Sequence, residues 1–159
     1  MVGIRAFFQT IIEMSGLGWS AALARWVVGI LFAVSGYWKV FTLGVGGHAE
    51  RFFVEAYRES WIPEWLLWAL GTSIPVIELI AGALLLVGYL TRPVLVTLGL
   101  LLVVTTYGHA LAEPLFDIDG HTFTRLALVM VALAVPAHHD RMRLDTVLRP
   151  GASRAGQGL

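Results

Sequence analysis

Residues 65–89 read WLLWALGTSIPVIELIAGALLLVGY, and this stretch decides the fold. Its only charged side chain is Glu78. The run is long enough to cross a bilayer, which takes about 20 apolar residues in a helix. A carboxylate near the middle of such a helix is costly unless it is paired, protonated or hydrated. The stretch therefore predicts a transmembrane helix, and Glu78 is a candidate functional residue.

The composition of the whole chain agrees with a membrane protein. Of its 159 residues, 57% are hydrophobic and 14% are charged, and the mean hydropathy is +0.76. A soluble domain of this length cannot bury that much apolar surface. The formal net charge is zero and no basic block is present, so nothing points to a nucleic-acid partner. The chain has no cysteine, which excludes disulfides, cysteine-bound zinc and iron–sulfur clusters.

Four apolar stretches predict an all-α, integral membrane four-helix bundle within residues 19–145. The expected spans are 20–41, 65–89, 93–112 and 122–137, and the last is the shortest. Lys and Arg are more frequent on the side that carries both termini, which predicts that both termini face the cytoplasm.

Three further segments are expected outside the spans. Residues 1–18 contain apolar residues at helical spacing opposite polar ones, which predicts a short amphipathic helix on the membrane surface. Residues 47–60 show a similar pattern and predict a second interfacial helix between the first two spans. Residues 146–159 are rich in glycine and small residues and predict a mobile tail.

Spacing places Glu78 on an inward face. Gly71, Pro75, Glu78 and Gly82 follow one another at steps of three or four residues, and the glycines allow another helix to approach closely. Pro75 removes a backbone donor and leaves a carbonyl to be satisfied by water or a side chain. From the expected depths of the residues, Arg25 is the favoured partner of Glu78, in a buried pair or ligand site. A protonated Glu78 is the alternative.

A second polar cluster is expected at the outer end of the bundle. Lys39, His109, Arg125 and His121 converge there, and they can hold an anionic group, a quinone carbonyl or a lipid headgroup. The competing interpretation is structural, because buried ion pairs can simply fix helix register and Lys39 and Arg125 can reach the membrane interface. The sequence indicates neither catalytic residues nor a metal site.

Two stretches resemble the DoxX family (DoxX/DoxD-like) of small four-helix integral membrane proteins. They are RWVVGILFAVSGYWKVF, residues 25–41, and IPVIELIAGALLLVGYLTRP, residues 74–93. RMRLD, residues 141–145, is a weaker match. The resemblance implies a multi-pass protein of a bacterial or archaeal cytoplasmic membrane, linked to quinone-coupled redox systems. The acidic third loop, LAEPLFDIDGHTFTR, departs from the family.

The leading functional hypothesis is an accessory membrane subunit of a quinone-linked or respiratory redox complex. Its partners would be membrane lipids and other redox subunits, its bound molecule a quinone or phospholipid, and the redox cofactor would lie in a partner. An enzyme acting alone is not indicated. The alternatives are a purely structural or assembly subunit, and a small proton or solute pathway that uses Glu78 as a relay.

Overall fold

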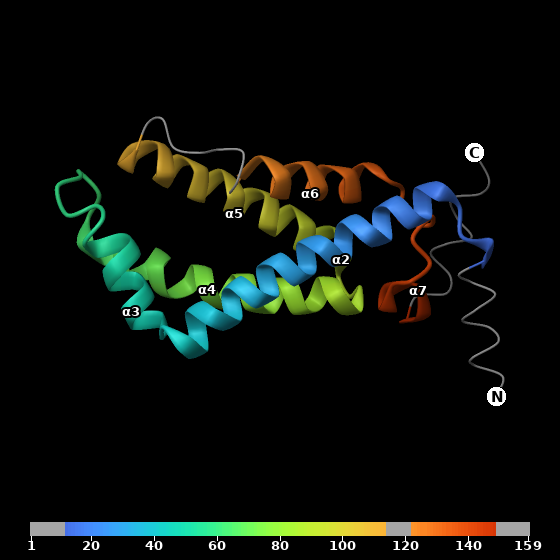
Figure 1. The fold of residues 1–159 in the computed structure, drawn as a ribbon, viewed down its shortest axis with the longest axis horizontal. Coiled ribbons are helices and arrows are strands. Elements are labelled where there is room, and N and C mark those ends of the chain that lie inside the picture. Colours follow the sequence, from blue (N-terminus) through green and yellow to red (C-terminus); the bar gives the residue numbers. More distant parts are fainter. Residues whose placement is uncertain (1–11, 114–121, 149–159) are drawn as a thin grey trace.

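The chain folds into helices joined by short connections (Figure 1). The computed structural model describes residues 12–113 and 122–148, and no strand occurs in these ranges. The elements are α2 (Gly16–Tyr37), the π-helical turn η1 (Trp38–Thr42), α3 (Val45–Ala49), the π-helical turn η2 (Glu50–Val54), α4 (Glu64–Val87), α5 (Thr91–Ala112), α6 (Thr124–Ala134) and α7 (Leu144–Leu148). The predicted all-α membrane fold is confirmed.

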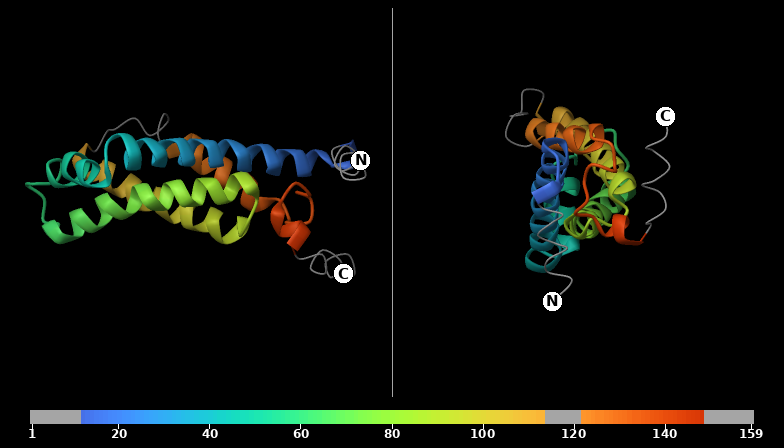
Figure 2. Two further views of the ribbon diagram at one scale, coloured as in Figure 1. Left: turned by 90° about the horizontal axis from the view of Figure 1, so that it is seen from below. Right: turned by 90° about the vertical axis from the view of Figure 1, so that its right-hand side faces the viewer.

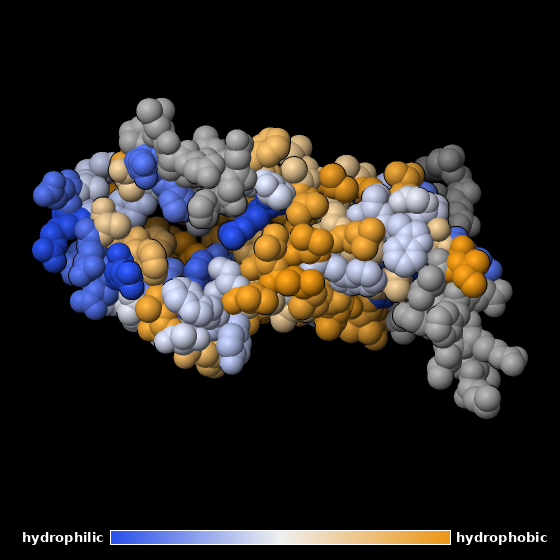
Figure 3. Space-filling model, viewed as in Figure 1, coloured by the Kyte–Doolittle hydropathy of each residue, from blue (hydrophilic) through white to orange (hydrophobic). Residues whose placement is uncertain are grey.

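Three helical segments are long and apolar enough to cross a membrane: Gly16–Thr42, Glu64–Val87 and Thr91–Ala112. The predicted fourth span, 122–137, is only partly helical. α6 has 11 residues, or about 16 Å at 1.5 Å per residue, against a hydrocarbon core of about 30 Å. It ends at Ala134 because Val135 precedes Pro136 and takes an extended conformation. On the face seen in Figure 3, hydrophobic residues gather over the middle of the molecule.

The three long helices and the shorter α6 form a bundle in which each packs against two others. α2 contacts α4 and α6, and α5 also contacts both α4 and α6. α2 and α4 lie side by side and run in opposite directions (Figure 2). At one end of the bundle α3 and η2 follow α2, and at the other lies α7 (Figure 1). These are called the α3 end and the α7 end below.

Glycines set the close packing of α2 on α4. A methyl group on Gly36 would overlap the backbone of Leu79, and one on Gly82 would overlap the backbone of Ala33. Both contacts fix the same antiparallel register of the two helices. The expectation that glycine-bearing faces permit a close approach is therefore confirmed.

The segment predicted as an interfacial helix, 47–60, is helical in α3 and η2 and packs directly on α4. Ala49 is fully buried, and a methyl group on Gly71 would lie 2.6 Å from its Cα atom. Most of the predicted amphipathic segment 1–18 lies outside the described residues. The predicted mobile tail begins with helical residues, since α7 continues to Leu148, and residues 149–159 are not described.

The apolar core joins α2, α4, α5 and α6. Buried side chains from α2, α4, α5 and α6 meet in it: Val28 and Phe32, Ala81 and Leu85, Leu95 and Leu98, and Val129. Its packing leaves the open space of the bundle at the α3 end.

Candidate functional site

A cavity of about 660 Å³ opens at the α3 end of the bundle. The space-filling view shows this end hollowed and bordered by hydrophilic residues (Figure 3). Every element from α2 to α6 contributes to its lining, which is mostly apolar and aromatic. Its polar and charged members include Lys39, His48, Arg51, Tyr57, Glu78, His109 and Arg125.

Glu78 forms its ion pair with Lys39 on this cavity. Lys39 Nζ donates to Glu78 Oε2 at 2.7 Å, and the Ser35 hydroxyl lies 3.4 Å from the same oxygen. The Glu78 side chain is 4% exposed and that of Lys39 is 21% exposed. Lys39 belongs to the π-helical turn η1, and such turns often occur at functional sites. The pair thus contributes one positive and one negative group to the cavity wall.

The predicted Arg25–Glu78 pair is wrong. Arg25 donates instead to the carbonyls of Leu85 and Leu86, which lie about 11 Å beyond Glu78 along α4 at 1.5 Å per residue. The prediction assumed that both helices cross the same depth. In the structure, α4 extends further toward the α3 end than α2 does, so its middle lies opposite the end of α2.

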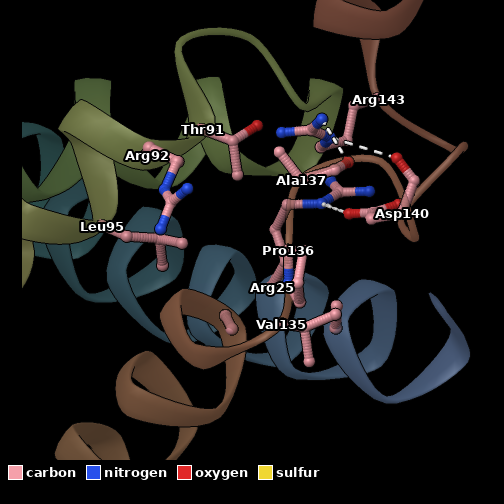
Figure 4. Close-up of a pocket in the computed structure, with 11 residues that line it drawn as sticks. Arg25, Thr91, Arg92, Leu95, Val135, Pro136, Ala137, Asp140 and Arg143 are labelled. Atoms are coloured by element: carbon pink, nitrogen blue, oxygen red, sulfur yellow. Dashed lines mark hydrogen bonds and ion pairs between the residues drawn. The ribbon is translucent and has the colours of Figure 1, made fainter. Parts of the chain in front are cut away.

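Arg25 belongs to a cluster at the α7 end (Figure 4). The guanidinium is fully buried, and its Nε donates to Asp140 Oδ2 at 2.9 Å while Nη2 donates to the Met142 carbonyl at 2.9 Å. Arg143 donates to the carbonyls of Asp140 and Ala137. These bonds fasten the chain after α6 across the ends of α2 and α4. The space left there is only about 10 Å³, so the cluster closes the bundle and leaves no room for a ligand.

Asp145 completes this closure by capping α5. Its carboxylate accepts hydrogen bonds from the backbone N–H groups of Leu90, at 2.9 Å, and Thr91, at 3.0 Å. Gly88 ends α4 with a φ of 72°, and a side chain there would meet Arg143. Burial raises the pKa of Asp145, but the two backbone hydrogen bonds, the Thr91 side chain and the charge of Arg143 together outweigh it, and the pKa lies below its ordinary value.

The predicted outer cluster is largely brought together. Lys39, His109 and Arg125 all line the cavity, and His121 lies outside the described residues. The guanidinium carbon of Arg125 lies 5.6 Å from the centre of the Phe32 ring, a cation–π contact. Among the described residues, no carboxylate lies within ion-pair distance of Arg125. Arg125 is thus a partly buried cation on the cavity wall.

His48 is the site residue that the sequence did not reveal. It is 4% exposed, and its Nδ1 lies 2.7 Å from the carbonyl oxygen of Gly71. In a regular helix this carbonyl accepts from the N–H of residue 75, which is Pro75 and has none. The predicted free carbonyl is therefore confirmed, and His48 supplies its donor. A histidine following two glycines near the end of a span was the only sequence signal for this residue.

The described wall of the cavity carries more positive than negative charge. Lys39, Arg51 and Arg125 are cations, and Glu78, already bonded to Lys39, is the one carboxylate among these lining residues. Such a lining favours an anionic or carbonyl-bearing group over a cation. In the described parts of the chain, no three His, Asp or Glu side chains are grouped to hold a metal ion.

Comparison with known families agrees with the membrane fold. Residues 17–113 match the family described as methylamine utilisation protein MauE. The chain belongs to the MauE family. No curated protein and no solved structure matches it. The small integral membrane character implied by the DoxX resemblance is confirmed, while a relation to DoxX itself stays a prediction.

The MauE match covers part of the cavity and little of the closure. It includes Lys39, His48, Glu78 and His109, and it ends before α6 with Arg125 and before Asp140. The match therefore covers the ion pair and the histidine on α3.

Proposed function

We propose that this MauE-family protein is an accessory membrane subunit of a redox system and that its α3-end cavity binds the headgroup of a quinone. The observation that carries the proposal is a cavity with an apolar, aromatic wall and an excess of cationic donors. Its volume falls within the range of about 300–1,000 Å³ that is usual for small-molecule sites. A quinone fits this lining because its ring is apolar and its two carbonyl oxygens accept hydrogen bonds.

The family's description refers to methylamine utilisation, and the redox system that we propose is accordingly one that oxidises amines. The cavity is poorly suited to methylammonium itself, since a cation would meet the net positive wall formed with Lys39, Arg51 and Arg125. Binding of the electron acceptor of the system, a quinone, is more consistent with this positive charge than binding of the amine. A partner would carry the redox cofactor.

The closed α7 end makes a solute pathway through the bundle a weaker hypothesis. Phe32, 1% exposed, is part of the cavity wall, Leu98 is 0% exposed in the core, and the buried Arg25–Asp140 pair closes the α7 end of the bundle. A purely structural subunit remains the contrasting hypothesis, and it predicts no ligand binding.

Quinone titration of the purified protein tests the proposal. Trp38 and Trp61 line the cavity, so a bound short-chain quinone should quench tryptophan fluorescence saturably. Arg125→Gln should weaken binding roughly tenfold or more, because a hydrogen bond to a charged group contributes about 1.5–3 kcal/mol.

Arg141→Gln is the matched control, since Arg141 is exposed and contacts Glu13 at the other end of the molecule. Saturable binding that is weakened only by Arg125→Gln supports the quinone site. Absence of saturable binding, or equal affinity in both variants, contradicts it. Mild-detergent co-purification with a cofactor-bearing redox protein tests the accessory role separately.

A further inference from the structure

The orientation of His48 is fixed by the backbone of α4. The carbonyl oxygen of Gly71 has no donor within its own helix, because residue 75 is a proline. A carbonyl oxygen can only accept hydrogen bonds. The proton must therefore lie on Nδ1 of His48, which is 2.7 Å from this oxygen. In the neutral ring, Nε2 then carries a lone pair and is a hydrogen-bond acceptor.

The packing of α3 keeps the imidazole in this place. Gly71 allows the backbone of Ala49 to approach α4 closely, and Phe52 and Phe53 lie with ring centres 5.3 and 5.6 Å from that of His48. His48 lines the cavity. Since Nδ1 is bonded to Gly71, Nε2 is the ring nitrogen that remains for a molecule in the cavity.

The neutral form of His48 is favoured by its surroundings. Burial lowers the pKa of His48 below 6.5 and outweighs the hydrogen bond to Gly71, which raises it; Lys39 lowers it and Glu78 raises it. The other titratable or charged groups on the described cavity wall are Arg51, Tyr57, Tyr107, His109 and Arg125. Burial raises the pKa of Tyr57, which keeps its hydroxyl neutral near pH 7.

Donors and acceptors are unequally available to a ligand. Arg125 supplies donors, and the Glu78 carboxylate accepts from Lys39 and Ser35 at Oε2. Nε2 of His48 adds an acceptor to this donor-rich wall. A headgroup with a hydroxyl hydrogen matches it better than one with carbonyl oxygens alone.

We propose that His48 is a ligand-binding residue whose Nε2 accepts a hydrogen bond from a hydroxyl group of a hydroquinone, the reduced form of the headgroup. The inference rests on the proposed function and deepens it by assigning a preference for the reduced form to one residue. Arg125 then serves the oxygen atoms of either form.

Paired titrations with a short-chain quinone and the matching hydroquinone, kept reduced under anaerobic conditions, test this role. The variant is His48→Asn, whose amide nitrogen takes the place of Nδ1 and still donates to Gly71, but which has nothing in the place of Nε2. We expect hydroquinone affinity to fall about three- to tenfold, as for one neutral hydrogen bond, and quinone affinity to change less than twofold.

The pH dependence of the wild-type protein provides a second measurement that needs no substitution. Protonation of Nε2 removes the acceptor, so hydroquinone affinity should decrease as pH falls, with a midpoint below 6.5. Quinone affinity should lack this midpoint.

The possible results separate the two proposals. If wild type and His48→Asn bind both forms alike and the wild-type profile is flat, the role of His48 is refuted while the quinone site stands. If the wild-type protein binds neither form, the proposed function fails and this inference fails with it. A hydroquinone-specific loss at low pH supports the inference even if His48→Asn does not fold.

Discussion

The hydrogen bond between His48 and Gly71 makes a quantitative prediction for stability. His48→Leu keeps an apolar side chain in the buried position but removes the donor to the Gly71 carbonyl. The carbonyl cannot recover an intrahelical bond, because residue 75 is a proline. An unsatisfied buried acceptor costs about 1–3 kcal/mol, and we expect the free energy of unfolding to fall by that amount.

Pro75→Ala supplies the missing donor and should suppress this loss. With an N–H at position 75, the Gly71 carbonyl accepts the ordinary helical bond even without His48. The Pro75 ring is fully buried, so Pro75→Ala has its own effect on packing, which a double-mutant cycle subtracts. We expect His48→Leu to cost about 1–2 kcal/mol less in the Pro75→Ala background than in the wild type.

Reversible unfolding in detergent, followed by circular dichroism, measures the four proteins of the cycle. His138→Leu is the matched control, because His138 is exposed and lies two residues before Asp140 of the cluster at the α7 end. Its effect should be the same in both backgrounds. Equal costs of His48→Leu in the two backgrounds, within about 0.5 kcal/mol, would refute the assignment of His48 as the donor that replaces the proline nitrogen.

Three further predictions concern the bundle itself. Gly36→Ala and Gly82→Ala should each lower the free energy of unfolding by about 1–3 kcal/mol, because the added methyl group overlaps the facing backbone. Gly99→Ala is the control and should not, because the nearest atom to its methyl group, on Val129, lies 3.7 Å away. Thermal unfolding compares the three variants. Asp140→Asn should cost about 3–5 kcal/mol by leaving a buried guanidinium unpaired, and quinone affinity should stay unchanged. The pKa of Asp145 is lowered in the folded protein, so its stabilising effect is complete above the ordinary carboxyl pKa and is lost as pH falls through the lower value. The difference in unfolding temperature between wild type and Asp145→Asn should shrink accordingly on acidification.

Hydrophobic patterning was sufficient to predict the helices. Three uncharged or nearly uncharged runs became the long helices of the bundle, and the spacing of Gly71, Pro75, Glu78 and Gly82 correctly indicated a face that packs inward. The short length of α6 was less accessible, because Pro136 lies within an apolar run whose overall hydropathy still resembles a span. The role of Asp140 was hidden for another reason: its partner, Arg25, is distant in sequence.

The Arg25–Glu78 pair was predicted wrongly because the depth of each residue in the membrane was derived from its own helix alone. The register of two packed helices is set by their closest contacts, and here these are the glycines. With Gly36 against Leu79 and Gly82 against Ala33, Lys39 lies within about one turn of the level of Glu78, while Arg25 lies about three turns away. A glycine stripe on each helix thus carries information about ion pairing as well as packing, provided that the two stripes are aligned with each other before side chains are matched. Aligned in this way, the same sequence assigns Arg25 to the closed end of the bundle and Glu78 to the cavity.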